Sequence, residues 1–341
     1  MSNFRKYLAA SVVAAAMIAS SGALAADFKA CQITDTGGVD DKGFNQTAWK
    51  GVQDAQKELG IEGKLLESKA ETDYVPNINS FIAEKCDIIV TVGFLLGDAT
   101  KAAAEAHPDQ KFSIVDFAYD PVIPNVLGQV YATDEAAFLA GYLAAGVSKT
   151  GVVGTFGGIN IPPVTIFMDG FARGVAYYNE QKGKDVQVLG WDPDKKEGLF
   201  TNNFSNLDDG RAFAKNLNEE GADIVMPVAG PVGQGSAALA TELGIDKLKI
   251  IGVDVDQYET DPEHKGVFLT SVLKRMDSTV VDAIKQAKDG SFKGGVIVGT
   301  LASGGVGLAP FHDLDSAVPA ELKDELAKLE AGIKDGSISV K

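Results

Sequence analysis

The sequence of 341 residues has few of the residues from which catalytic and metal sites are built. It contains three histidines, His107, His264 and His312, which lie far apart without the spacing of a zinc site. The sequence has no Gly-x-Ser-x-Gly elbow, phosphate-binding loop or cysteine–histidine arrangement. These absences argue against an enzyme, and we expect neither a cofactor nor a metal.

Basic residues and long apolar runs are also scarce. The formal net charge is −16, and so acidic a chain would repel nucleic acid and anionic membrane surfaces. After residue 26, no segment reaches the roughly 20 apolar residues that a membrane-spanning helix needs. We therefore expect a monomer that is free in its compartment and has no nucleic-acid partner.

The first 26 residues have the three parts of a signal peptide. Arg5 and Lys6 form the basic region, residues 8–18 the apolar run, and the small residues that end at Ala26 the cleavage site. Lipid attachment would need a cysteine at the cleavage point, but Cys31 lies five residues farther on. We predict a periplasmic protein that is exported, cleaved near Ala26 and not anchored.

Two cysteines, Cys31 and Cys86, remain in the mature chain. Each stands at the start of an apolar run typical of a buried strand. An exported protein enters an oxidising compartment, where disulfides form. In a sheet of strand order 2-1-3 the two cysteines would begin neighbouring strands. A disulfide and two separate buried thiols are both compatible with this pattern.

Apolar runs typical of strands alternate with helical patterns along the mature chain. Residues 87–92 and 223–228 predict buried strands, and residues 47–59 predict an amphipathic helix closed by Gly60. Such repeated units indicate an α/β fold whose parallel sheets are covered on both faces. About ten strands are too many for one sheet. Because they divide near Thr133, we predict two similar lobes.

The strand predicted at residues 267–273 comes after the second lobe is complete. We infer that the chain crosses back to the first lobe there and returns through the glycine-rich run 294–307. Several crossings would form a hinge that closes around a ligand. The predicted divisions are a signal peptide at 1–26, an N-terminal lobe of 27–132 plus 257–293, and a C-terminal lobe of 133–256 plus 294–341.

Two acids, Asp40 and Asp41, fall where the first helix would begin, after a turn freed by Gly37 and Gly38. They could be a pair of glycosidase carboxylates. We favour a helix cap, because a carboxylate accepts hydrogen bonds from the free N–H groups of a helix start. One of the two acids is then structural.

Polar or aromatic residues also recur where predicted strands end. In open α/β sheets, the carboxyl ends of the strands face the crevice in which ligands bind. An aspartate at such an end can also be a helix cap, but the coincidence in both lobes predicts a ligand site between them. These residues are Asp35, Asp116 with Phe117, Gly230, Asp254 with Asp256, and Lys274.

Six motifs follow one another along the mature chain. In chain order they are DTGGVDDKGFNQTAWKG (35–51), VGF (92–94), VDF (115–117), ATDEAAFLAGYLAA (132–145), GVDVDQ (252–257) and LTSVLKR (269–275). They resemble those of the basic membrane protein (BMP) family, substrate-binding proteins of ABC importers. The resemblance, closest to the purine nucleoside receptor A type, implies two Rossmann-like lobes of the periplasmic-binding protein type I class. It also implies a purine nucleoside in the cleft and an ABC permease of the inner membrane as partner.

By this resemblance, two aromatic residues would stack on the two faces of the base. Phe44 matches the aromatic of the first lobe, although such a residue could also be a core residue beside the helix start. Phe204 falls near the aromatic of the second lobe, but the pattern around it is altered, and Phe200 is the alternative. A Phe–base–Phe sandwich is favourable because both partners are flat and apolar.

The resemblance also assigns the polar contacts. Asp116 would accept hydrogen bonds from the base edge, and Asp254 and Lys274 would hold the ribose hydroxyls. Lys274 could instead be a solvated surface lysine. The same groups would suit riboflavin or another aromatic, hydroxylated solute, and a secreted nucleoside hydrolase is a weaker alternative. The further contacts that the resemblance suggests are Asp35, Asn45 and Gly230.

Overall fold

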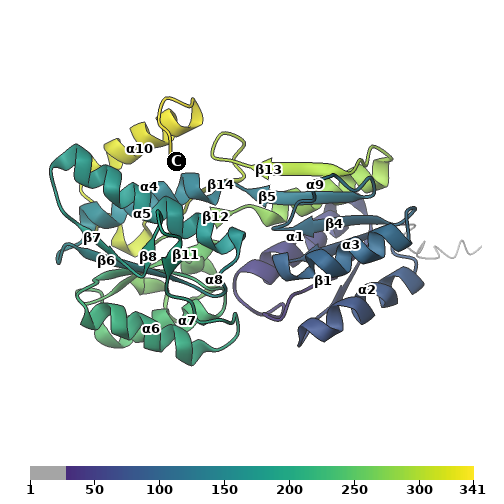
Figure 1. Ribbon diagram of the computed structural model, residues 1–341, viewed down its shortest axis with the longest axis horizontal. Helices are drawn as coiled ribbons and strands as arrows, with labels where there is room; N and C mark the ends of the chain where they lie inside the picture. The colour runs from purple at the N-terminus through teal and green to yellow at the C-terminus, as the bar shows by residue number, and fades with distance from the viewer. Residues whose placement is uncertain (1–27) are drawn as a thin grey trace, which may run out of the picture.

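The computed structural model describes residues 28–341 (Figure 1). This part of the chain forms two α/β lobes side by side, each built around a six-stranded sheet. The predicted signal peptide lies outside the described residues. Within residues 28–341, no helix combines the length and the apolar character needed to cross a bilayer.

The first lobe has a wholly parallel sheet of order β13-β5-β4-β3-β1-β2. Helices α1 and α9 pack together, and α2 and α3 form a second pair. The strands are β1 (Lys29–Ile33), β2 (Glu62–Leu66), β3 (Ile88–Val92), β4 (Lys111–Val115), β5 (Val126–Tyr131) and β13 (Gly295–Gly299). The helices are α1 (Phe44–Leu59), α2 (Tyr74–Ala83), α3 (Gly97–Ala106) and α9 (Met276–Asp289), with short 3₁₀ turns η1 (Glu71–Asp73) and η2 (Phe94–Leu96).

The second lobe has a sheet of order β14-β12-β11-β10-β6-β7, in which only β14 is antiparallel to its neighbour. Its strands are β6 (Val152–Gly157), β7 (Gln187–Leu189), β10 (Ile224–Val228), β11 (Lys249–Asp254), β12 (Phe268–Lys274) and β14 (Val306–Leu308), with a hairpin of β8 (Trp191–Asp192) and β9 (Glu197–Gly198). Its helices are α4 (Thr133–Val147), α5 (Pro162–Lys182), α6 (Leu207–Glu219), α7 (Val232–Leu243), α8 (Gln257–Thr260) and α10 (Ala320–Lys334), with 3₁₀ turns η3 (Lys265–Val267) and η4 (His312–Ala317).

The predicted place of the return crossing is wrong. Strand β12 pairs in parallel with β11 and therefore completes the second sheet instead of returning to the first. The chain crosses after β12, since α9 packs on α1 and β13 pairs with β5 in the first sheet. It then returns to the second lobe at β14. An apolar strand fits either sheet equally well, so its sequence does not reveal its partner.

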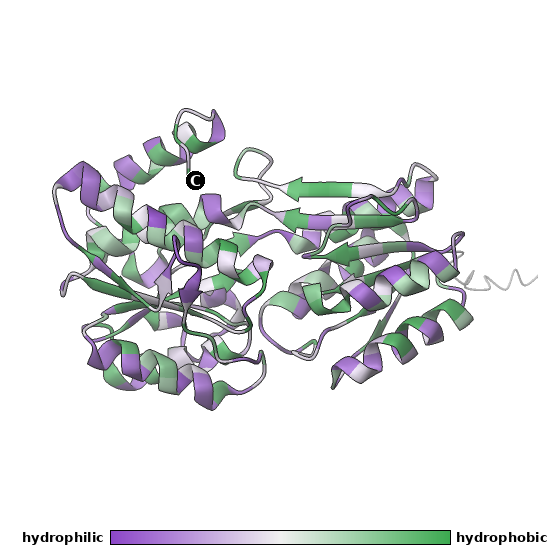
Figure 2. Ribbon diagram, viewed as in Figure 1, coloured by the Kyte–Doolittle hydropathy of each residue, from purple (hydrophilic) through white to green (hydrophobic). Residues whose placement is uncertain are grey.

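The core of the second lobe depends on a close approach between α4 and α5. Hydrophobic residues concentrate on the strands and inner helix faces (Figure 2). Helix α4 is buried over nearly its whole length. A Cβ at Gly141 would lie 2.0 Å from the Phe171 carbonyl oxygen, and one at Gly174 equally close to that of Phe138. Only glycine permits this backbone contact.

Cys31 and Cys86 form a disulfide, with their Cα atoms 6.1 Å apart. The order β2-β1-β3 predicted for the first strands is confirmed, and it brings Cys31 of β1 close to Cys86, which lies two residues before β3. The disulfide links β1 to the start of β3 at the edge of the sheet opposite to the strand ends that carry Asp35 and Gly93.

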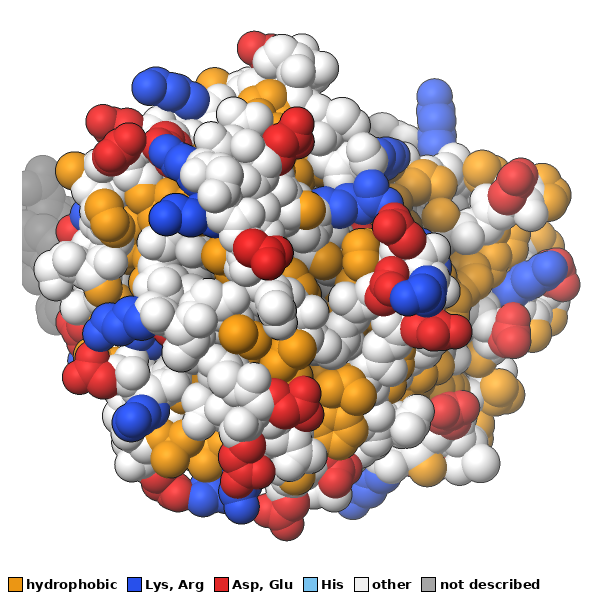
Figure 3. All heavy atoms as spheres, turned by 60° about the vertical axis from the view of Figure 1, so that its left-hand side comes forward, with side chains coloured by type: hydrophobic (Ala, Val, Ile, Leu, Met, Phe, Trp, Pro, Cys, Tyr) orange, Lys and Arg blue, Asp and Glu red, His pale blue; other side chains and the backbone are white. Residues whose placement is uncertain are grey.

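Charges of both signs are interspersed on the face drawn in Figure 3, which shows no continuous basic area. Opposite charges pair on the surface of the protein, for example Arg211 with Glu242 and Lys149 with Asp246. Such exposed pairs contribute little to stability.

Candidate ligand-binding site

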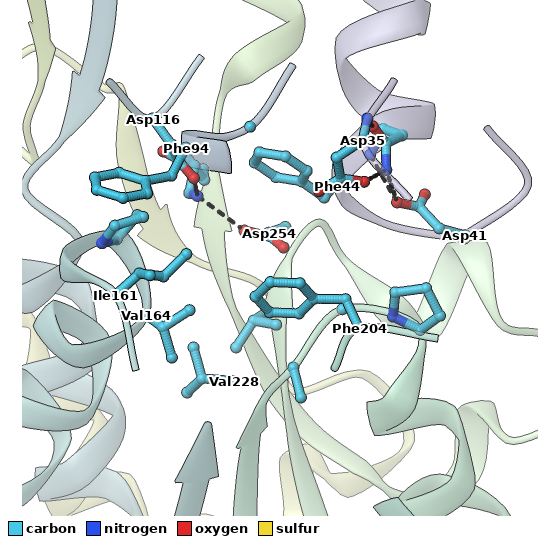
Figure 4. Close-up of a pocket in the computed structure, with 18 of the residues that line it drawn as sticks. Asp35, Asp41, Phe44, Phe94, Asp116, Ile161, Val164, Phe204, Val228 and Asp254 are labelled. Carbon is cyan, nitrogen blue, oxygen red and sulfur yellow. Dashed lines mark hydrogen bonds and ion pairs between the residues drawn. The ribbon is translucent and has the colours of Figure 1, made fainter. Parts of the chain in front are cut away.

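A cavity lies between the lobes, where strands of both sheets end (Figure 4). Residues from distant parts of the chain meet here as the strand-end rule predicts. The structure brings together at this cavity the eight residues that the resemblance assigns to the ligand: Asp35, Phe44, Asn45, Asp116, Phe204, Gly230, Asp254 and Lys274. The strand-end residues Phe117 and Asp256 do not line it. Phe117 packs against Phe94, and Asp256 caps α8 and pairs with His312.

Aromatic rings from opposite lobes face the cavity. Phe44 is the first residue of α1 in the first lobe, and Phe204 lies in the loop before α6 in the second. The Phe204 ring lies against Gly158, where a Cβ would come within 2.3 Å of it. Phe200 points elsewhere and packs edge-on against Trp191, with ring centroids 5.9 Å apart. Of the two alternatives, the structure therefore places Phe204 at the cavity.

A buried lysine joins the two lobes at the side of the cavity. Lys274 Nζ lies 2.7 Å from Asp116 Oδ2 in the first lobe and 3.4 Å from Asp254 Oδ1 in the second. Its side chain is only 3% exposed, so the alternative of a solvated surface lysine is wrong. Burial acts to lower the pKa of Lys274, but the two carboxylates outweigh it and raise that pKa. Lys274 is therefore a fixed cation in the cleft.

The backbone is strained at equivalent positions of the two lobes. Asp116 follows β4 with φ 65°, and Asp254 ends β11 with φ 71°. A residue other than glycine pays on the order of 1 kcal/mol for this left-handed conformation, and such strain clusters at functional sites. Both side chains are turned toward Lys274 and the cavity.

Asn45 links two further carboxylates beneath Phe44. Its Nδ2 donates to Asp35 Oδ1 at 2.7 Å and to Asp41 Oδ2 at 3.1 Å, and its Oδ1 accepts from the Asp35 N–H. Asp35 also accepts a hydrogen bond from the Gly37 N–H. Burial raises the pKa of Asp35, although the hydrogen bonds from Asn45 and Gly37 oppose it. The network fixes the first-lobe side of the cavity.

Asp41, and not Asp40, caps the start of α1. Its carboxylate accepts from the backbone N–H groups of Gly43, Asn45 and Gln46 at 2.7–3.1 Å. Burial raises the pKa of Asp41 to about 7, against the effect of these hydrogen bonds. Asp40 is exposed. The capping role predicted for this pair is confirmed, and Asp41 also lines the cavity.

Two aromatic residues of the cavity were missed by the sequence reasoning. Phe94 follows β3 by two positions and packs against Phe117, with ring centroids 5.0 Å apart and the rings tilted by 45°. The strand-end rule that found Asp116 would also have found it. Phe167 lies on α5, with its ring centroid 5.4 Å from Lys274 Nζ. Its spacing along the helix is that of an ordinary core residue, so no local signal in the sequence distinguishes Phe167 from the residues of the core.

The chemistry of the cavity suits a ligand with flat apolar faces and several N–H or O–H donors. Four carboxylates and one ammonium line it together with the aromatic rings. Among residues 28–341, no group of three or more histidine, cysteine or acidic residues has a metal-binding arrangement. The arrangement is one for holding a molecule by hydrogen bonds and ring contacts.

Comparisons with known proteins agree with this geometry. The family model for PnrA-like ABC transporter substrate-binding proteins matches residues 28–341. The ABC transporter nucleoside-binding protein BmpA of Lactococcus lactis is 34% identical over 337 residues, covering 94% of this chain and 91% of that protein. Basic membrane protein A of Borreliella burgdorferi is 31% identical over 323 residues, covering 94% and 89%.

The fold is shared with a solved structure of the same kind. An ABC transporter solute-binding protein from Aeropyrum pernix K1 superimposes with a TM-score of 0.82 at 25% identity, covering 92% of each chain. The predicted α/β class with two lobes is confirmed, and so is the family resemblance of the motifs. Members of this family are substrate-binding proteins and not enzymes. The chain belongs to the family of PnrA-like ABC transporter substrate-binding proteins.

Proposed function

We propose that this substrate-binding protein captures a purine nucleoside in the cleft and delivers it to an ABC permease of the inner membrane. The observation that carries the proposal is the pair of rings, Phe44 and Phe204, that face one cavity from opposite lobes. A base between them would gain roughly 0.5–1.5 kcal/mol per ring beyond the buried area. The name of the Lactococcus lactis relative, a nucleoside-binding protein, supports the same ligand class.

The polar groups beside the rings suit the rest of a nucleoside. Asp254 and Lys274 offer an acceptor and a donor to vicinal ribose hydroxyls, and Asp116 offers a second acceptor to the N–H groups of the base edge. Hydrogen bonds to charged groups are the stronger ones, at about 1.5–3 kcal/mol each. The rings bind any flat base, so these acceptors select among ligands.

The charge of the cavity favours a nucleoside over a nucleotide. Asp35, Asp41, Asp116 and Asp254 face it with a single balancing cation, Lys274. A phosphate would enter among these carboxylates, and buried charges are weakly screened, so the repulsion would be large. We therefore expect adenosine, guanosine or inosine to bind and AMP to be rejected.

The protein would act as an exported monomer in the periplasm, cleaved near Ala26. N-terminal sequencing of the protein recovered from a periplasmic fraction tests export. A mature chain starting at or next to Asp27 is expected. Recovery of the full-length chain from the cytoplasm would contradict it.

Calorimetry with purified protein tests the ligand. We expect a Kd in the micromolar to nanomolar range for at least one of adenosine, guanosine and inosine, that is about −8 to −12 kcal/mol. Asp116→Ala and Asp254→Ala should each weaken binding at least about tenfold. No heat with any of the three nucleosides would refute the proposed ligand and leave the fold intact.

Mass spectrometry of small molecules that co-purify distinguishes the remaining candidates. A purine nucleoside is expected, whereas riboflavin or another aromatic, hydroxylated solute would assign the same cleft to a different cargo. Chromatography of the nucleoside after long incubation should recover it unchanged, because the family is one of binding proteins.

A further inference from the structure

The two lobes also touch outside the cavity, at its mouth. Thr260 Oγ1 donates to the Lys42 carbonyl oxygen at 2.7 Å, and Gln234 Nε2 donates to the Asp41 carbonyl oxygen at 2.9 Å. Lys42 Nζ lies 2.9 Å from Asp261 Oδ1. Asp41 and Lys42 belong to the first lobe and the other three residues to the second. We call these five residues the mouth clasp.

The local fold aims Lys42 at the second lobe. Lys42 has φ 56°, a left-handed conformation, immediately before the start of α1. This conformation directs both its carbonyl group and its side chain toward the segment around α8. Because the conformation is unfavourable for lysine, the surrounding contacts must hold it. The cross-lobe hydrogen bonds of the clasp are contacts of that kind.

The partner of Lys42 is a buried carboxylate. The Asp261 side chain is 2% exposed, and its second oxygen lies 2.8 Å from His264 Nδ1 within the same lobe. The Lys42 side chain, from the other lobe, is 33% exposed and covers this carboxylate from outside. Separation of the lobes would break this ion pair, whose short distance is that of a charge-assisted hydrogen bond. Closure is therefore favoured by the pair.

The clasp adjoins the cavity without the ion pair being part of it. Lys42, Thr260 and Asp261 do not line the cavity. The neighbouring Asp41 carboxylate nevertheless caps the helix that begins with Phe44. Lys42 of the clasp and Phe44, whose ring faces the cavity, thus lie on one short segment.

We propose that Lys42 is a positioning residue that, through Asp261, holds the lobes closed over the ligand and sets the rate of release. The proposal rests on ligand binding in the cleft, but not on which nucleoside is bound. A ligand that binds only the closed form has an apparent Kd that rises as the closed fraction falls. The Lys42–Asp261 pair raises that fraction from outside the cavity.

Stopped-flow kinetics with inosine test this role, with the full mature chain in each case. Lys42→Met should release inosine about five- to thirtyfold faster, with an association rate within about twofold of the wild type, since the clasp forms after entry. Lys42→Arg should restore slow release. The matched control is Lys50→Ala, because Lys50 is an exposed lysine of α1 whose ion pairs with Asp54 and Asp277 stay in the first lobe.

The proposed role would be overturned if Lys42→Met released inosine at the wild-type rate. It would also be overturned if Lys50→Ala changed the release rate as much as Lys42→Met does. A cooperative thermal unfolding transition without ligand shows that the variant is folded. Small-angle X-ray scattering without added nucleoside separates the two proposals: Lys42→Met should have a larger average radius of gyration than the wild type. Identical scattering would also overturn the clasp, whereas a wild type that binds none of adenosine, guanosine and inosine would overturn only the proposed ligand.

Discussion

Two phenylalanines, one from each lobe, carry the proposed contact with the base. We expect Phe44→Ala and Phe204→Ala each to raise the Kd for the bound nucleoside about tenfold or more, because each removes one face of the stack. Isothermal titration calorimetry measures the change. Leucine at either position should retain part of the affinity, since it restores apolar area without a ring.

Phe200 is the matched control for Phe204. It lies four residues away in the same loop but packs on Trp191 and against Gly157. Phe200→Ala should therefore lower the free energy of unfolding by about 3 kcal/mol and leave the Kd within about twofold. A larger effect on binding from Phe200 than from Phe204 would contradict the assignment of the rings.

The titration of Asp41 should appear in the pH dependence of stability. Burial raises the pKa of Asp41 to about 7 in the folded protein, well above its value of 3.8 in an unfolded chain. Between these pH values the folded state holds a proton that the unfolded state releases, so this group makes stability fall as pH rises. The slope from one such group is at most about 1.4 kcal/mol per pH unit.

Asp41→Asn removes the titration and should flatten the profile between about pH 4 and pH 7. The variant also loses part of the helix cap, which lowers its stability at every pH. The diagnostic quantity is therefore the difference in slope, measured by urea unfolding at a series of pH values. Parallel profiles for the wild type and the variant would show that Asp41 ionises normally.

For individual residues, the sequence predicted which side chains meet at the cavity but not which contacts fix their positions. The strand-end rule and the motifs led to Asp116, Asp254 and Lys274, and all three meet at the cavity. The sequence could not distinguish Asp40 from Asp41 as the cap, because both acids precede the same helix. The backbone conformation decides it, and no local pattern reveals that conformation.

Among the secondary-structure elements, β5 has no clear strand pattern in its sequence. Its sequence VLGQVY has a glycine and a glutamine in the middle, which interrupt the apolar pattern of a buried strand. Gly128 gives room to the Phe117 carbonyl oxygen, 2.5 Å from where a Cβ would lie. The buried Gln129 amide donates to Ser113 Oγ at 2.8 Å. Both features depend on neighbouring strands, which the sequence alone does not display.

The position of β12 was predicted in the wrong lobe for a related reason. Its length and apolar character were recognised, but its sheet is set by pairing with β11 and β14. Long-range pairing is not encoded in local periodicity. The sequence predicts elements with clear local signals more accurately. For example, α1 ends at Leu59, and Gly60 after it has the left-handed φ of 64° expected of a helix stop.

The contact between α4 and α5 gives a test of packing between elements. Gly141→Ala would place a methyl group 2.0 Å from the Phe171 carbonyl oxygen. Because neither backbone can yield without moving a helix, we expect a loss of about 3 kcal/mol or more in the free energy of unfolding. Chemical denaturation of the mature protein measures it.

Gly266 supplies the control for this substitution. A Cβ there meets no atom within 4 Å, and its backbone is not left-handed. Gly266→Ala should change the free energy of unfolding by less than about 1 kcal/mol. Equal effects at Gly141 and Gly266 would mean that the close approach of the helices is unimportant.

The whole molecule is two similar lobes that share one site and are joined at one side. The chain crosses between them after β5, β12 and β13, and the cavity lies where strand ends of both sheets face each other. The lobes meet again at the mouth clasp. The lobes are linked covalently on one side and by non-covalent contacts on the other. This arrangement suits hinge closure around a small molecule.

The measurement that tests the central claim most directly is a crystal structure of the mature protein with inosine. We predict that the base lies between the rings of Phe44 and Phe204. The ribose hydroxyls should lie within hydrogen-bonding distance, about 2.6–3.2 Å, of Asp254 and Lys274. A ligand bound outside this cavity, or inside it with neither ring against the base, would contradict the account.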